Sequence, residues 1–273
     1  MGFLTKVQIK TPEQIEKMRK AGLVVGETLE VLRAAARPGV TLLELDAIAE
    51  DSIRSRGGVP SFKGYHGFPG SICASVDEVV VHGIPGSREL KDGDIISIDC
   101  GAIVDGWHGD AAITVAMGSV PEEVSELMRV TEESMWHGIA AARLGGRVTD
   151  ISHAIETYVD SQGDYGILED FSGHGIGTEM HMEPSVFNYG KPGKGPKLQR
   201  GIALAVEPML TLGGPEVTTL EDDWTVVTDD GSWAAHFEHT FALTSDGAWV
   251  LTALDGGEEM LGKLGVPWGG HRG

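Results

Sequence analysis

The chain has few cysteines, no long apolar run and no excess of basic residues. Its 273 residues include only Cys73 and Cys100, so at most one disulfide could form, and reduced thiols in a reducing compartment are expected. The first ten residues lack the apolar core of a signal peptide, and no stretch approaches the ~18 apolar residues of a membrane span. By elimination, the sequence predicts a cytoplasmic protein with no membrane partner.

Basic residues are outnumbered by acidic ones. The chain has 21 Lys and Arg against 41 Asp and Glu, a formal net charge of −20. Binding to nucleic-acid phosphates needs basic patches, so direct nucleic-acid recognition is not expected. The motifs H-E-x-x-H, C-x-x-C and G-x-S-x-G are also missing, which argues against the common zinc proteases, zinc fingers and serine hydrolases.

Two segments of the chain resemble each other. Residues 11–56 and 121–162 each have the pattern of two helices joined by a Gly-containing turn. A helix start is predicted at Thr11, a capping box at Thr41 and a second-half helix start at Pro121. Strand-like motifs then recur in the same order, and three pairs of positions correspond: Asp99 and Glu207, Asp110 and Glu238, and His82 and His181. Two facing α+β halves would bring these residues to one seam.

Five residues with metal-binding side chains lie in these motifs: Asp99, Asp110, His174, Glu207 and Glu238. Asp99 and Glu207 end apolar runs, where an unpaired carboxylate is strongly unfavourable. Only Arg200 is close to Glu207 in sequence, which argues against the alternative of a buried salt bridge. Four carboxylates and one imidazole suit two divalent ions that share bridging carboxylates, and such a site favours a metallohydrolase.

These motifs together resemble type I methionine aminopeptidases. The resemblance rests on G-Y-H-G-F-P-G-S-I-C-A-S-V-D-E-V-V-V-H-G-I-P, the Asp99/Asp110 hairpin, G-H-G-I-G, H-M-E-P, A-V-E-P-M and F-E-H-T, and it extends from about Ile9 to Leu251. It implies an α+β pita-bread (creatinase/aminopeptidase) fold with antiparallel sheets flanked by helices. Its pseudo-symmetric halves would cover about residues 11–118 and 121–252. We expect a single catalytic domain over residues 1–273 with short flexible ends.

The resemblance also implies residue roles. Two divalent ions (cobalt, manganese, iron, zinc or nickel) would be bound by Asp99, Asp110, His174, Glu207 and Glu238. Glu207 would shuttle a proton, His181 would stabilise the oxyanion and His82 would contact the scissile nitrogen. The implied substrate-binding residues are Tyr65, Phe68, Cys73, His82, His181 and Trp224. The implied reaction is removal of the N-terminal (initiator) methionine from nascent proteins and peptides whose second residue is small. A monomer is the default expectation for the oligomeric state.

The chain departs from the family pattern at several positions. Phe62 stands where bacterial relatives often have Cys, and Met180 stands at an often aromatic position. Asp77 stands at an often-Asn position beside an implied monovalent-cation site. The loop G-G-P-E-V-T-T-L-E-D-D is acidic, although the family's ribosome-facing loop is often basic. The ribosome is therefore an implied partner for which no basic docking loop is evident.

Two alternatives stay open. Prolidases and aminopeptidases P resemble this chain in metal ligands, but they carry a large N-terminal domain, for which a first helix at Thr11 leaves no room. A catalytically inactive binding module of the same fold would typically lack ligands, and all five are present here.

Overall fold

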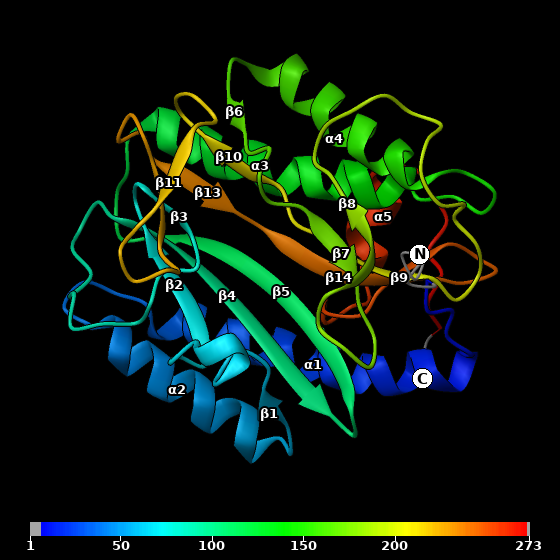
Figure 1. Ribbon diagram of the computed structural model, residues 1–273, viewed down its shortest axis with the longest axis horizontal. Coiled ribbons are helices and arrows are strands. Elements are labelled where there is room, and N and C mark those ends of the chain that lie inside the picture. Colours follow the sequence, from blue (N-terminus) through cyan, green and yellow to red (C-terminus); the bar gives the residue numbers. More distant parts are fainter. Residues whose placement is uncertain (1–6, 272–273) are drawn as a thin grey trace, which may run out of the picture.

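A curved antiparallel sheet forms the centre of the computed structural model, which describes residues 7–271 (Figure 1). Its strands, and those of two smaller sheets, are β1 (Val59–Pro60), β2 (Ile72–Val76), β3 (Val79–Val81), β4 (Ile95–Val104), β5 (Trp107–Ala116), β6 (Gly166–Ile167), β7 (Gly173–Gly175), β8 (Met182–Val186), β9 (Ala203–Val206), β10 (Met209–Thr211), β11 (Val217–Thr219), β12 (Val226–Thr228), β13 (Ala234–His236), β14 (Glu238–Leu243) and β15 (Ala248–Val250). The central sheet has the order β1-β4-β5-β14-β9-β7-β8, with β2 added beside β4 and β15 beside β14. The smaller sheets are β13-β10-β6 and β11-β12-β3.

The helices are α1 (Pro12–Ala35), α2 (Leu42–Ser55), α3 (Glu122–Ala141), α4 (Val148–Gln162), α5 (Glu258–Lys263) and the short 3-10 turn η1 (Tyr65–Gly67). Four of the helices, α1 to α4, begin where the sequence predicts, whereas α5 and the turn η1 were not predicted. Thr11 and Thr41 form complete capping boxes at α1 and α2, and Pro121 is the N-cap of α3. Each box satisfies backbone N–H groups that the first helical turn leaves unpaired. Local side-chain chemistry thus determines where these helices start.

The two halves of the chain meet at the middle of the central sheet. Strands β5 and β14 are neighbours there, and β4 and β9 flank them as equivalent strands of the first and second half. Figure 1 shows α1 and α2 with the first half and α3 and α4 with the second. This arrangement confirms the two-half α+β fold. Asp99 on β4 and Glu207 directly after β9 occupy corresponding places, as do Asp110 on β5 and Glu238 on β14.

Helix α1 packs unusually close to the sheet. A Cβ on Gly109 would lie 2.8 Å from the backbone nitrogen of Gly22, and a Cβ on Gly22 would overlap the carbonyl of Leu251. Apolar residues of α1 such as Met18 and Leu32 are fully buried on either side of this contact. The absence of side chains at both glycines therefore sets the spacing between α1 and β5, the strand that carries Asp110.

Gly22→Ala is expected to destabilise the protein by about 1–3 kcal/mol or more, because backbone must move to admit the methyl group. Gly262→Ala is the matched control, since this helical glycine has open space around its missing Cβ. That control is expected to be neutral or stabilising by about 0.5–1 kcal/mol. Urea unfolding of both variants measures the difference. Equal midpoints for the two variants would contradict the close-packing account.

For the C-terminal segment the sequence predicts only a short flexible end. The structure shows the short helix α5 there, and Trp268 donates from Nε1 to the carbonyl of Gly256 at 2.9 Å. Arg19 holds the preceding loop by donating to the carbonyls of Leu251 (2.7 Å) and Ala253 (2.6 Å). Residues 1–6 and 272–273 lie outside the described range, so the predicted flexible ends and single catalytic domain stay predictions. None of the helices in residues 7–271 has the length and apolarity required to cross a membrane.

Candidate metal centre and substrate cavity

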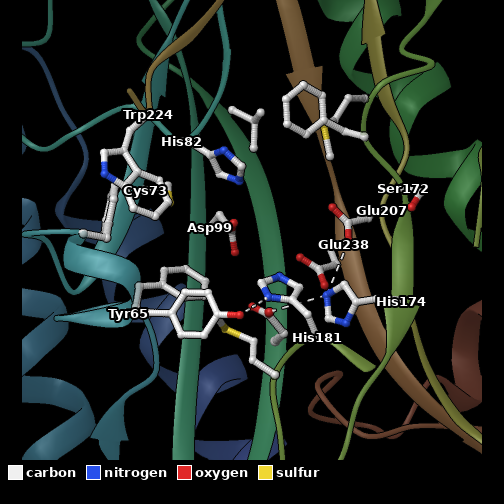
Figure 2. Close-up of a pocket in the computed structure, with 17 residues that line it drawn as sticks. Tyr65, Cys73, His82, Asp99, Ser172, His174, His181, Glu207, Trp224 and Glu238 are labelled. Atoms are coloured by element: carbon white, nitrogen blue, oxygen red, sulfur yellow. Dashed lines mark hydrogen bonds and ion pairs between the residues drawn. The ribbon is translucent and has the colours of Figure 1, made fainter. Parts of the chain in front are cut away.

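A cavity of about 180 Å³ opens at the seam between the two halves. It is lined by all five predicted metal ligands and all six predicted substrate-binding residues: Asp99, Asp110, His174, Glu207 and Glu238, with Tyr65, Phe68, Cys73, His82, His181 and Trp224. Figure 2 shows Glu207, Glu238 and His174 on one side, the ring of Trp224 on the other, and Asp99 between them. The departures Phe62 and Met180 also line it, and so do four residues that the sequence did not single out: Val81, Phe171, Ser172 and Met209.

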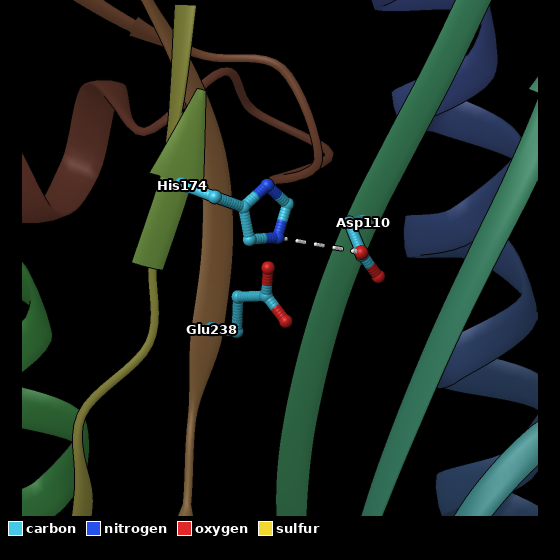
Figure 3. Close-up of side chains that lie close together, drawn as sticks. All are labelled: Asp110, His174 and Glu238. Carbon is cyan, nitrogen blue, oxygen red and sulfur yellow. Dashed lines mark ion pairs between the residues drawn. The ribbon is translucent and has the colours of Figure 1, made fainter. Parts of the chain in front are cut away.

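The five candidate ligands come from five separate strands or strand ends and meet within a few ångströms. His174 Nε2 lies 4.0 Å from Asp110 Oδ2 and 3.5 Å from Glu207 Oε1. One donor atom each from Asp110, His174 and Glu238 lies within 4.8 Å of the other two (Figure 3). The backbones of the two halves are tied at this point, because Thr240 Oγ1 accepts from the Asp110 N–H and donates to the Asp110 carbonyl. This contact holds the two central strands, and therefore their carboxylates, in fixed register.

Asp110 and Glu238 are buried, Asp99 and Glu207 are partly buried, and no Lys or Arg of residues 7–271 forms an ion pair with any of the four. Burial raises the pKa of Asp99 to about 7. Burial, reinforced by the neighbouring carboxylates, raises the pKa values of Asp110, Glu207 and Glu238 well above the usual range. Among residues 7–271, buried oxygens of Asp99, Asp110 and Glu238 have no hydrogen-bond partner, and the only ion-pair neighbours of the cluster are histidines. Such a set of unpaired oxygen donors fits hard divalent cations.

His174 is oriented as a metal ligand. Its Nδ1 lies 2.9 Å from the carbonyl of Gly175 and donates to it, so Nε2 presents a lone pair to the carboxylates. Burial, with a smaller effect from His181, lowers the pKa of His174 to about 3, which keeps the ring neutral. A neutral imidazole with its second nitrogen tied to a backbone carbonyl is the usual state of a metal-binding histidine.

Two further histidines border the same space. Tyr65 Oη lies 3.0 Å from His181 Nδ1, and restricted solvation lowers the pKa of His181, with His66 adding a smaller effect. A phenol O–H that donates to Nδ1 leaves the proton of the neutral ring on Nε2, where it can be donated to a substrate. Burial lowers the pKa of His82 to about 4, and its ring packs edge-on against Phe171. Both rings are therefore neutral hydrogen-bonding groups at pH 7.

Tyr65→Phe removes the partner that selects the His181 tautomer. A typical net hydrogen bond contributes about 0.5–1.5 kcal/mol, so kcat is expected to fall roughly 2- to 10-fold with a smaller change in KM. Steady-state kinetics on a Met-peptide measure this change. A parallel Phe68→Leu variant alters the pocket wall and should act mainly on KM. The same change in KM alone for both variants would show that Tyr65 serves only as a wall.

His236 is a buried histidine of the centre to which the sequence analysis assigned no role. It is 1% exposed, and one donor atom each from Glu207, His236 and Glu238 lies within 4.8 Å of the other two. It stands two residues before Glu238, so strand alternation places both side chains on one face. That alternation in A-A-H-F-E was the available signal.

Asp77, beside the predicted monovalent-cation site, pairs with a basic residue. Its Oδ2 accepts from Arg88 Nη2 at 2.7 Å, and its Oδ1 accepts from the backbone N–H of Ile95 at 3.0 Å. One acidic residue of the loop at residues 213–223 stabilises the local backbone. Asp222 accepts hydrogen bonds from the backbone N–H groups of Trp224 (2.9 Å) and Thr225 (2.7 Å). Asp222 therefore helps to hold the indole that closes the cavity.

The sequence is similar to known proteins along most of its length. Residues 16–245 match the model of "Metallopeptidase family M24". A methionine aminopeptidase of Clostridium acetobutylicum is 55% identical over 248 residues, which cover 90% of this chain and 99% of that protein. Methionine aminopeptidase 1 of Mycobacterium tuberculosis is 52% identical, with 88% and 92% covered.

Solved structures show the same relationship. The crystal structure of methionine aminopeptidase from Thermotoga maritima has a TM-score of 0.89 and 43% identity, with 91% of this chain and 100% of that chain covered. Prolidase from Pyrococcus furiosus has a TM-score of 0.72 but only 22% identity, and the match covers 65% of that longer chain. The second likeness shows a shared fold and no more.

Proposed function

The chain belongs to metallopeptidase family M24 and, within it, to the methionine aminopeptidases, and on this premise we propose that it removes N-terminal methionine from peptides and nascent proteins whose second residue is small. The observation that carries the proposal is the cluster of four carboxylates and His174 at the end of an apolar cavity, where three of the carboxylates have a buried oxygen without a hydrogen-bond partner among residues 7–271. The cavity, at about 180 Å³, is smaller than the ~300–1,000 Å³ clefts of drug-sized ligands. It suits one side chain and the adjoining peptide bond.

We propose that Asp99, Asp110, His174, Glu207 and Glu238 would hold two divalent ions. Asp110 and Glu238 would contribute their carboxylates from the two central strands, one from each half of the chain. Ions bound there supply polarisation of the scissile carbonyl and acidification of a water molecule. Cobalt, manganese, iron, zinc and nickel are all compatible with this donor set, which does not select among them.

The protein's own groups then bind, orient and move protons. Glu207, at the edge of the ligand cluster, accepts the proton of the attacking water and returns it to the leaving amine. His181 Nε2–H donates to the carbonyl oxygen as negative charge develops on it. His82, on the opposite wall, contacts the nitrogen of the scissile bond. Walls of Tyr65, Phe68, Cys73 and Trp224, with Phe62 and Met180, surround the methionine side chain, whose flexible thioether fits an aromatic slot.

The test is a substrate panel with the metal-free protein and added Co²⁺, Mn²⁺ or Fe²⁺. Release of methionine from Met-Ala-Ser, and much slower release from Met-Lys-Ser, is the expected result. Cleavage of Gly-Pro peptides alone would favour the prolidase alternative. Absence of cleavage with every metal would favour an inactive binding module.

Several finer expectations accompany this proposal. A cytoplasmic location and a monomeric state are proposed from the sequence, and nascent polypeptides are the proposed macromolecular substrates. Residues 213–223 contain no basic residue. If the protein contacts the ribosome, we propose that it does so through a surface other than this loop. Both carboxylate oxygens of Asp77 already accept hydrogen bonds, from Arg88 and from the Ile95 N–H. A monovalent cation near Asp77 would therefore take carbonyl groups as its ligands.

A further inference from the structure

His236 is held rigidly with its ring toward Glu207. Its backbone N–H donates to Thr114 Oγ1 at 3.0 Å, and its carbonyl accepts from the same hydroxyl at 2.8 Å. Its Nε2 is buried and has no hydrogen-bond partner in the described part of the chain. The nearest acidic atom is Glu207 Oε2, at 3.9 Å.

The two oxygens of Glu207 therefore face different histidines. Oε1 lies 3.5 Å from His174 Nε2, the nitrogen that is free for a metal. Oε2 points the other way, toward His236 Nε2. A ligating carboxylate usually has its second oxygen hydrogen-bonded, and this outer partner fixes its orientation. His236 is the group in position to supply that bond.

Charge and geometry decide between a ligand and a hydrogen-bond donor. Four carboxylates neutralise two divalent ions, so a third ion among Glu207, His236 and Glu238 would leave buried positive charge. An ion held by His174 would lie on the Oε1 side of Glu207, because Oε1 is the oxygen that faces His174 Nε2. A movement of about 1 Å brings Nε2 and Oε2 into hydrogen-bond range.

We propose that His236 is a positioning residue for Glu207. Its Nε2–H donates to Oε2, which turns Oε1 toward His174 and the metal position and holds the carboxylate in place for proton transfer. This inference rests on the proposed function, because it deepens the role of Glu207 in the same centre.

The test compares His236→Leu, which removes the donor, with His236→Gln, which retains an N–H donor of similar reach. His239→Gln is the matched control, because His239 lies beyond Glu238 on the far face of the sheet, with Nδ1 2.8 Å from Thr252 Oγ1. Calorimetric titration of each metal-free protein with Mn²⁺ gives affinity. Kinetics on Met-Ala-Ser give kcat and KM, and Co²⁺ absorption spectra report the ligand set.

His236→Leu is expected to bind Mn²⁺ about 10- to 100-fold more weakly, with lower kcat and little change in KM. His236→Gln should recover most of both losses with an unchanged Co²⁺ spectrum, and the control should bind as the wild type does. Wild-type affinity in the Leu variant would overturn the proposal. So would a His236→Gln protein that fails to recover affinity or has an altered Co²⁺ spectrum, since the imidazole would then be a ligand.

A measurement on the wild type covers the case in which the Leu variant fails to fold. In the Zn²⁺-loaded protein, the imidazole ¹H–¹⁵N spectrum, assigned with His236→Gln, should show a protonated Nε2 on His236. An unprotonated Nε2 would overturn the proposal. Wild-type cleavage of Met-Ala-Ser tests the proposed function separately: if it occurs while the His236 results fail, only this inference falls.

Discussion

Glu207→Gln is expected to lower kcat/KM on Met-Ala-Ser by about 10²- to 10⁴-fold, the usual contribution of a positioned general acid or base. The amide keeps the shape of the side chain but cannot accept the proton of the attacking water. It also offers a weaker metal ligand, which saturating Mn²⁺ should offset, whereas the loss caused by the missing proton acceptor should persist at saturating Mn²⁺. Steady-state kinetics over a range of metal concentrations measure both effects.

The same substitution should not harm the fold. Burial disfavours the charged form of Glu207 and raises its pKa, so a neutral amide removes an unfavourable charge from the metal-free protein. Its thermal midpoint in EDTA is expected to equal or exceed that of the wild type. Glu123→Gln, in the first turn of α3, is the control for a generic loss of acid. Full activity in the Glu207 variant, or collapse of its fold, would refute the assigned role.

Metal removal is expected to reverse the pH dependence of stability. The folded pKa values of Asp99, Asp110, Glu207 and Glu238 are raised, to about 7 for Asp99. A carboxyl group with a raised folded pKa stabilises the fold below its unfolded pKa of about 4, and this stability is lost as pH rises through the folded value. The metal-free protein should therefore lose stability between pH 5 and 7.5. Bound metal needs the deprotonated ligands, so its affinity should increase over the same range.

Thermal unfolding midpoints, measured in EDTA and in Mn²⁺ at pH 5 and at pH 7.5, test this prediction. At a free metal concentration 100 times Kd, binding contributes about 2.7 kcal/mol, which corresponds to roughly 5–10 °C for a chain of this size. The difference between the metal-loaded and metal-free midpoints should be larger at pH 7.5 than at pH 5. Equal stabilisation at both pH values would show that these carboxylates do not bind the metal.

Local chemistry made much of this structure predictable. Capping boxes at Thr11 and Thr41 predict helix starts because they satisfy backbone groups within one turn. Asp99 and Glu207 were identifiable because a carboxylate at the end of an apolar run is unfavourable without a partner. The internal repeat predicted that corresponding residues of two facing halves would meet at one seam, and β5 and β14, one from each half, are neighbours there.

Features that depend on which segments the tertiary fold brings together were harder to predict. Phe171 and Met209 reach the cavity from segments whose positions are set by the whole second half. His236 carries no comparable signal, because a histidine in an apolar run is commonly a core residue, and only strand alternation before Glu238 points to its place in the centre. Helix α5 is only six residues long, and helices this short gain their stability from packing, which local pattern does not reveal.

The most direct measurement is methionine released from Met-Ala-Ser by metal-free protein as Co²⁺, Mn²⁺ or Fe²⁺ is added, followed by mass spectrometry. The account predicts no release in EDTA and a rate that rises with metal and saturates once the centre is filled. Release that is equally fast in EDTA, or no release with any of these ions, would contradict a two-ion centre built from the five residues at the seam.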